Sequence, residues 1–142
     1  MVDVTVQMSV AAAPDQVATV MFDPLRDPEW IGGARRAEML GSVPYGVGSR
    51  VRRSGAFLGR NFSWVTEVTE FDPGRSVRMK HVAGPFSGGV DYSITPTSAG
   101  SEVTIRNYGE ANFWFPFLGP MMRASVRGDL KRLSRLATSD QS

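Results

Sequence analysis

Residues 76–107 read SVRMKHVAGPFSGGVDYSITPTSAGSEVTIRN, in which apolar and polar residues alternate along three runs. Turn residues separate the runs at Gly84-Pro85 and at Ser98-Ala99-Gly100. Alternation with a period of two is typical of strands that bury one face. Links as short as these join antiparallel neighbours. The stretch therefore predicts two consecutive β-hairpins.

Charge pairing predicts the register of the two hairpins. A first hairpin centred on Gly84-Pro85 places Arg78 opposite Asp91. A second hairpin centred near Thr97-Ser98 places Asp91 opposite Arg106. Asp91 then lies between two arginines on the solvent face, and a slip of one residue would bury these charges. The inner face in this register consists of Val77, Met79, His81, Val90, Tyr92, Ile94, Val103, Ile105 and Asn107.

The flanking sequence adds further strands and helices. Strands are expected at residues 4–10, 34–40, 48–57 and 61–71, beside those at 76–83, 87–96 and 102–110. Two short helices are expected at residues 14–22 and 25–31, since Pro14 and Asp15 suit a first helical turn. A long helix is expected at residues 118–137. The predicted order is one strand, two helices, six strands and one long helix.

The hairpin before residue 72 has two possible registers. If Leu58-Gly59 is a two-residue turn, Arg50 lies opposite Glu67 on the solvent face. The inner face then consists of Val51, Arg53, Phe57, Phe62, Trp64 and Thr66. A bulge at Gly55 or Gly59 would reverse these faces. Arg53 is therefore either an inward-facing cation beside Trp64 or one of a surface cluster of arginines.

The long helix carries an apolar stripe with an acid beside it. Leu118, Met122, Val126, Leu133 and Leu136 recur at helical spacing. Asp129 falls within or beside this stripe, and a buried carboxylate needs a partner. The partner is either Arg53 or His81 across the interior, or a structural contact to the backbone or the short helices; we favour the structural contact.

Composition excludes several classes of function. The 142 residues suit one domain, 1–142, with a sizeable core. The chain has no cysteine and one histidine, so neither a disulfide framework nor a metal site is expected. A net charge of +2 is too small to indicate a nucleic-acid-binding protein. The N-terminus predicts a strand rather than a signal peptide, and no run is long enough to insert stably in a membrane. A cytoplasmic location is expected.

The order of elements and several local motifs resemble one known family. The matching stretches are Ala13-Pro14-Asp15-Gln16-Val17, Asp27-Pro28-Glu29-Trp30, Gly46-Val47-Gly48-Ser49-Arg50, Val68-Thr69-Glu70-Phe71-Asp72-Pro73-Gly74-Arg75 and Asp129-Leu130-Lys131-Arg132-Leu133. Together they resemble the polyketide cyclase/dehydrase and lipid-transport branch of the START-like (SRPBCC) superfamily. The resemblance implies an α+β helix-grip fold: a curved, seven-stranded antiparallel sheet wrapped around a long C-terminal helix, with two short helices after the first strand. It also implies an internal cavity.

Two functions suit such a cavity. The first is a carrier or sensor that binds a small hydrophobic, lipid-like or polyketide-like molecule without a cofactor. Its expected lining is Phe62, Trp64, Met79, Val90, Tyr92, Ile105, Asn107, Met122, Val126 and Asp129. The second is an aromatase/cyclase that closes a poly-β-ketone by aldol chemistry. His81, or a water held by Tyr92, would then be the base, and Arg53 would stabilise the enolate. The alternative for His81 is a half-buried histidine near a turn.

An aromatic segment at residues 113–117 precedes the long helix. It suggests a lid over the cavity, a homodimer contact, or simple packing under the helix. A third function, protein interaction as in antitoxin-like relatives, would use the same segment. We prefer the lid or the packing to a membrane contact, because few cations flank the segment.

Overall fold

The computed structural model describes residues 2–41, 44–57, 59–110 and 117–139. Its elements are β1 (Val2–Val10), α1 (Pro14–Met21), the 3-10 turn η1 (Pro24–Arg26), α2 (Asp27–Trp30), β2 (Ala34–Leu40), β3 (Arg50–Phe57), β4 (Arg60–Asp72), β5 (Ser76–Ala83), β6 (Gly89–Thr97), β7 (Gly100–Gly109) and α3 (Leu118–Ser139). The strands form one seven-stranded antiparallel sheet in the order β1-β7-β6-β5-β4-β3-β2. The predicted order of elements is confirmed.

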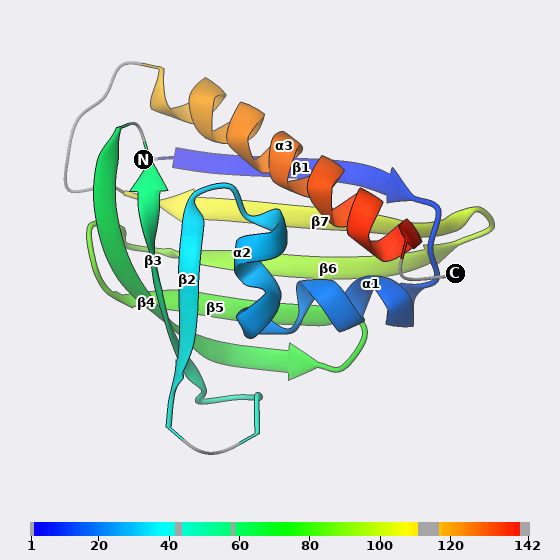
Figure 1. The fold of residues 1–142 in the computed structure, drawn as a ribbon, viewed down its shortest axis with the longest axis horizontal. Helices are drawn as coiled ribbons and strands as arrows, with labels where there is room; N and C mark the ends of the chain where they lie inside the picture. Colours follow the sequence, from blue (N-terminus) through cyan, green and yellow to red (C-terminus); the bar gives the residue numbers. More distant parts are fainter. Residues whose placement is uncertain (1, 42–43, 58, 111–116, 140–142) are drawn as a thin grey trace.

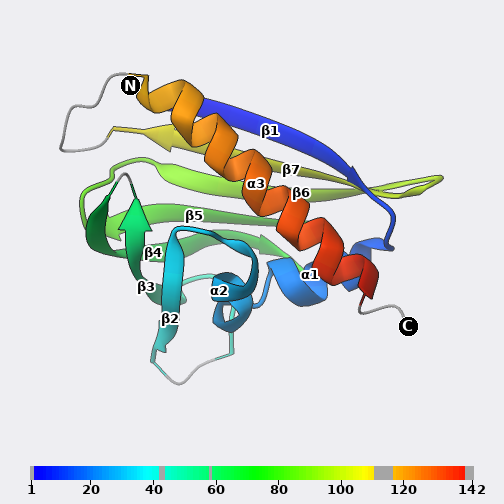
Figure 2. The ribbon, with the colours of Figure 1, turned by 45° about the horizontal axis from the view of Figure 1, so that its top comes forward.

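The sheet is strongly curved, and the helices lie on its concave face. Figure 1 shows β2 and β3 running across the direction of β5, β6 and β7. The long helix α3 crosses the concave face diagonally, with α1 and α2 beside it (Figures 1 and 2). This sheet wrapped around a long helix is the expected helix-grip arrangement.

Both predicted hairpin registers after residue 75 are confirmed. Arg78 pairs with Asp91 between β5 and β6, and Asp91 pairs with Arg106 between β6 and β7. The Arg78 Nε atom lies 3.6 Å from Asp91 Oδ2. Arg106 instead turns its guanidinium to Asp3 on β1, with N–O distances of 3.0 and 2.8 Å. These charges thus lie on the convex face, away from the helices.

The register of β3 and β4 follows the two-residue turn. Arg53 lies opposite Trp64, and Arg50 lies opposite Glu67. Along residues 50–57 and 60–67 the pairing has no shift, so the bulge that would turn Arg53 outward does not occur there. Shifts occur instead between β2 and β3 and between β4 and β5. Arg53 therefore points to the interior, where 5% of its surface is exposed.

One end of the space beneath α3 is filled by α1. This helix begins at Pro14, and the Gln16 side chain accepts a hydrogen bond from the Ala13 N–H at 3.1 Å. Phe22, just after α1, stacks on Tyr92 with 6.5 Å between the ring centroids. The fully buried side chains of this end are Val17, Val20, Met21, Leu130, Leu133 and Ala137.

Candidate functional site

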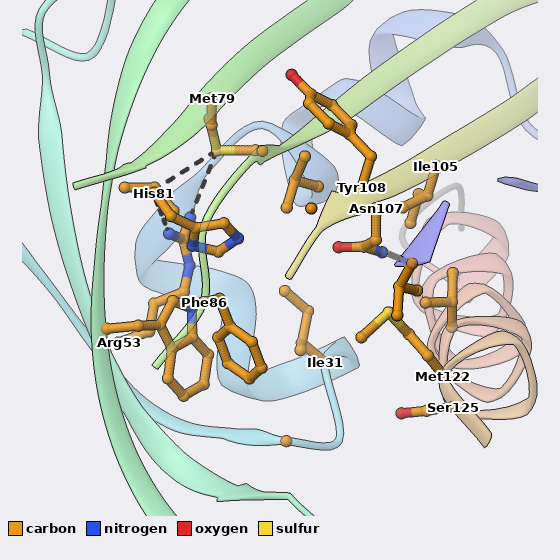
Figure 3. Close-up of a pocket in the computed structure, with 18 of the residues that line it drawn as sticks. Ile31, Arg53, Met79, His81, Phe86, Ile105, Asn107, Tyr108, Met122 and Ser125 are labelled. Atoms are coloured by element: carbon orange, nitrogen blue, oxygen red, sulfur yellow. Dashed lines mark hydrogen bonds between the residues drawn. The ribbon is translucent and has the colours of Figure 1, made fainter. Parts of the chain in front are cut away.

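A cavity of about 170 Å³ lies between the sheet and the N-terminal half of α3 (Figure 3). Of the twelve residues that the sequence assigned to the site, eleven line it: Arg53, Trp64, Met79, His81, Val90, Tyr92, Ile105, Asn107, Met122, Val126 and Asp129. Phe62 is the exception, because it lies behind Phe86, which does line the cavity, with 5.9 Å between the two ring centroids. The alternating pattern thus selects the correct face but does not show where the cavity ends.

The cavity opens to solvent at the ends of β6 and β7. Ser87 and Glu110 line this opening, and both are exposed. Their backbones bond to each other, with Ser87 N donating to Glu110 O at 2.8 Å. The Glu110 N–H donates in turn to Ser87 Oγ at 3.1 Å. This part of the rim is therefore polar and is held together by hydrogen bonds.

Arg53 reaches the cavity wall but its charge is already neutralised. Its Nε donates to Asp27 Oδ2 at 2.5 Å, and its Nη1 donates to Thr66 Oγ1 at 2.6 Å. A third donor, Nη2, lies 3.9 Å from Met79 Sδ. Asp27 is 1% exposed and begins the short helix α2. The ion pair thus anchors α2, which carries Trp30, to strand β3.

Burial and ion pairing have opposite effects on the pKa values of Asp27 and Arg53. Burial raises the pKa of the Asp27 carboxyl to about 6, although the adjacent Arg53 guanidinium lowers it. Burial lowers the pKa of Arg53, but Asp27, Tyr92 and Tyr45 together outweigh burial, and the pKa of Arg53 is raised. The pair is therefore ionised at neutral pH, and the donors of Arg53 are largely occupied.

His81 faces the cavity as a neutral imidazole. Burial, followed by the charge of Arg53, lowers its pKa to about 4. Its ring lies 5.7 Å from that of Phe86, and within the described residues neither ring nitrogen has a hydrogen-bond partner. Figure 3 shows His81 and Asn107 extending toward each other from opposite sides of the cavity. The side chain of Asn107 likewise has no hydrogen bond to the described residues.

Asp129 has the structural contact that we favoured. Its Oδ1 accepts hydrogen bonds from the Gly32 N–H at 2.9 Å and from Arg132 Nη2 at 2.5 Å. Arg132 Nε also donates to the Trp30 carbonyl at 2.9 Å. Burial raises the pKa of Asp129, opposed by Gly32 and Arg132. Asp129 therefore ties α3 to the end of α2 and pairs with neither Arg53 nor His81.

Sequence reasoning missed the partner of Arg53 and part of the wall. Asp27 begins the motif Asp27-Pro28-Glu29-Trp30, and no local pattern shows that it meets a residue 26 positions away. Ile31, Phe86 and Ser125 also line the cavity. Phe86 follows the turn at Gly84-Pro85, a position that alternation does not place on either face.

Other expected features lie partly outside the described structure. Residues 113–116 of the aromatic segment are outside the described residues, so the expected lid and homodimer contact lie there too; Phe117 is 78% exposed. In the described residues, no three His, Cys, Asp or Glu side chains are grouped as metal ligands would be. Likewise, no helix among them combines the length and apolarity needed to cross a bilayer.

Comparison with solved structures finds the same fold in several proteins. A protein from Thermus thermophilus is 19% identical, with a TM-score of 0.79 and 99% coverage of both chains. Zhui aromatase/cyclase from Streptomyces sp. R1128 is 19% identical, with a TM-score of 0.75, covering 99% of this chain and 95% of that one. A START superfamily protein from Mycobacterium smegmatis is 19% identical, with a TM-score of 0.73 and coverages of 94% and 92%.

Sequence comparison identifies the family. Among curated proteins, none is similar enough to this sequence to count as a match. The family model described as polyketide cyclase / dehydrase and lipid transport matches residues 1–138, nearly the whole chain. The chain therefore belongs to the polyketide cyclase/dehydrase and lipid transport family.

Proposed function

We propose that this protein binds a small hydrophobic or polyketide-like molecule in the cavity beneath α3, as a carrier or sensor. The apolar lining of that cavity is the observation that carries the proposal. Aromatic and aliphatic side chains from the sheet, α2 and α3 converge on it, including Trp30, Trp64, Met79, Ile105 and Met122. Sites for small molecules are typically concave, mostly apolar and fitted with a few polar groups.

The volume of the cavity supports a role in ligand binding. On the scale measured for cavities in protein cores, a space of about 170 Å³ forgoes packing worth at most about 4 kcal/mol. That is a large part of the stability of a domain of this size. A ligand that fills the space would recover part of this energy, because apolar surface leaves water on binding.

The alternative is an aromatase/cyclase, which the similarity to the Streptomyces aromatase/cyclase favours. Aldol closure needs a base whose pKa lies near the working pH. His81 has its pKa lowered to about 4, which makes it a weak base at pH 7. Arg53 would have to stabilise an enolate with donors that already bond Asp27 and Thr66. These two features favour binding over catalysis.

Native mass spectrometry of detergent-free protein tests the binding function. We expect an additional mass of a retained apolar molecule, or saturable uptake when apolar compounds are added. The variant Ser125→Leu places a large side chain in the cavity wall and should abolish the uptake. The matched control is Ala124→Leu, on the solvent side of α3, which should retain it. Saturable uptake that survives Ser125→Leu, or its absence from the unmodified protein, would refute this proposal.

The cyclase alternative has its own test. Incubation with a poly-β-ketone analogue should give cyclised product, and His81→Ala and Arg53→Ala should each abolish it. Loss of product is meaningful only where the variant retains its folded circular dichroism spectrum, because Arg53 is also part of a buried ion pair. The absence of turnover by the unmodified protein would leave binding as the function of the cavity.

A further inference from the structure

The charged groups of the cavity wall are matched within the protein. Arg53 bonds Asp27, and Asp129 bonds Arg132 and the Gly32 N–H. His81 is neutral at pH 7 because its pKa is lowered to about 4. Glu110 is the remaining ionisable carboxylate of the described wall, and it lies exposed at the mouth. A charged group brought into the cavity would lose its hydration without gaining a counter-ion.

Two neutral polar side chains of the wall are available to hydrogen-bond a ligand. His81 belongs to β5 and Asn107 to β7, with β6 between them. Neither has a hydrogen-bond partner among the described residues, and Figure 3 shows them extending toward one another across the cavity. The Nδ1 atom of His81 is buried, so the imidazole offers a ligand its Nε2 atom as a donor or an acceptor, and the amide of Asn107 offers both. Together they match a hydroxyl or a carbonyl group.

Two glycines allow the chain just before β6 to lie close to the end of β7. The His81 N–H donates to Gly88 O at 2.9 Å, and the neighbouring strand β7 ends at Gly109. Both glycines have positive φ, 79° for Gly88 and 130° for Gly109. A Cβ would collide with the Tyr108 carbonyl at Gly88 and with the Ser87 carbonyl at Gly109. The two backbone segments can therefore lie this close together only with glycine at both positions.

We infer that the ligand is an uncharged molecule with a ring-sized apolar group and a hydroxyl or carbonyl that hydrogen-bonds His81 and Asn107. This inference rests on the proposed binding function and narrows it. The cavity, at about 170 Å³, is close to the engineered cavity of about 150 Å³ that binds benzene. Any further part of the molecule extends toward solvent past the hydrogen-bonded Ser87 and Glu110. Anions that would bring their charged group into the cavity are excluded as ligands.

Four single-ring probes test this ligand class: toluene, benzyl alcohol, benzoate and benzylamine. They share a ring and differ in charge and hydrogen bonding, so NMR titrations at pH 7 compare those properties alone. Benzyl alcohol should bind up to about tenfold more tightly than toluene, as one or two neutral hydrogen bonds allow. Benzoate and benzylamine should bind at least tenfold more weakly than benzyl alcohol. A preference for either charged probe would overturn the inference.

Variants of the two polar residues complete the test. Asn107→Leu keeps the number of side-chain heavy atoms, His81→Phe adds one ring atom, and both variants remove the polar atoms. In each variant the affinity for benzyl alcohol should fall toward the affinity for toluene measured on the same variant. Unchanged benzyl alcohol binding in both variants would overturn the assigned hydrogen bonds.

The failure of this inference differs from the failure of the binding function. If none of the four probes binds while mass spectrometry shows a retained molecule, the ligand class is wrong and the cavity still functions in binding. If neither the probes nor any retained molecule binds, both the inference and the proposed function fail.

Discussion

The two halves of α3 lie on the same sheet but have different surroundings. In the C-terminal half, Leu130, Leu133 and Ala137 have no exposed surface. In the N-terminal half, Met122 and Ser125 are only half-buried and face the cavity. Figure 2 shows α1 lying against the C-terminal half of α3. The side chains of α1 fill one end of the concave space, and the other end stays hollow.

This difference shows where the cavity comes from. A curved sheet around a helix does not by itself leave a void, since the end beneath α1 is closely packed. The boundary between the two ends is α2, held to the sheet by the Asp27–Arg53 pair and to α3 by Asp129 and Arg132. Trp30 of α2 packs edge-on against Tyr92, with 5.8 Å between the ring centroids. The hollow end therefore depends on polar contacts that keep this wall in place.

The largest effect is expected at that boundary. Asp27→Ala leaves the Arg53 guanidinium buried without a counter-ion and should lower the free energy of unfolding by about 3–5 kcal/mol. Urea denaturation measures the change. The double variant Asp27→Leu/Arg53→Met removes both charges and should recover much of the loss. The exposed Arg52–Glu38 pair is the control, because Arg52→Ala should cost about 1 kcal/mol or less. A loss for Asp27→Ala as small as that of the control would contradict this account of the wall.

Truncation should distinguish the packed end from the hollow end. Leu133→Ala creates a new cavity among fully buried side chains and should cost about 2–5 kcal/mol. Met122→Ala only enlarges a space that exists already, and about 1 kcal/mol is expected, because fewer contacts are lost. Urea denaturation of both variants provides the comparison. Equal losses would mean that the two ends are packed alike in solution.

The sequence predicted the fold and the lining face for a definite physical reason. Short turns and alternating charges leave one register for β5, β6 and β7, and a slip would bury Asp91 and its arginines. The register with Leu58-Gly59 as a two-residue turn likewise predicted that Arg53 faces the interior, as the structure shows. Periodicity therefore determines which residues face the interior.

The rest of the site depends on packing between distant elements. The pairing of Asp27 with Arg53 joins a helix to a strand 26 residues later, and neither segment carries a pattern that identifies the other. Phe62 has the correct face but lies behind Phe86, because the lining also depends on how the sheet curves. The volume of the cavity and the pairing of its polar side chains depend on how the helices and strands pack together.

Enlarging a side chain should also destabilise the packed end of α3 more than the hollow end. Ala137→Leu inserts three carbons where no space exists and should cost about 1–3 kcal/mol by overpacking. Ser125→Leu inserts a similar volume into the cavity, and its stability should change by less than about 1 kcal/mol. Thermal denaturation of the two variants measures the contrast. A loss for Ser125→Leu as large as that for Ala137→Leu would show that the hollow end has no room for a ligand.

The smallest effect is a pH dependence from His81 at the hollow end. Its pKa in the fold, about 4, lies below the ordinary value of 6.5, so the unfolded chain takes up the proton first as the pH falls. The stability from neutral His81 is thus complete above pH 6.5 and is lost as the pH falls toward 4. Asp27 acts in the opposite sense, because its raised pKa of about 6 gives stability below pH 3.8 that is lost as the pH rises through 6.

His81→Gln isolates the histidine contribution, since glutamine does not titrate and Asp27 is common to both proteins. The free energy of unfolding from urea should fall more steeply for the unmodified protein between pH 7 and pH 4.5. We expect the difference from His81→Gln to shift by about 1–2 kcal/mol in favour of the variant, less than a fully buried imidazole would give, because the ring is partly open to the cavity. A difference that stays constant with pH would mean that His81 is solvated like a surface histidine, and the neutral wall inferred for the ligand would lose its basis.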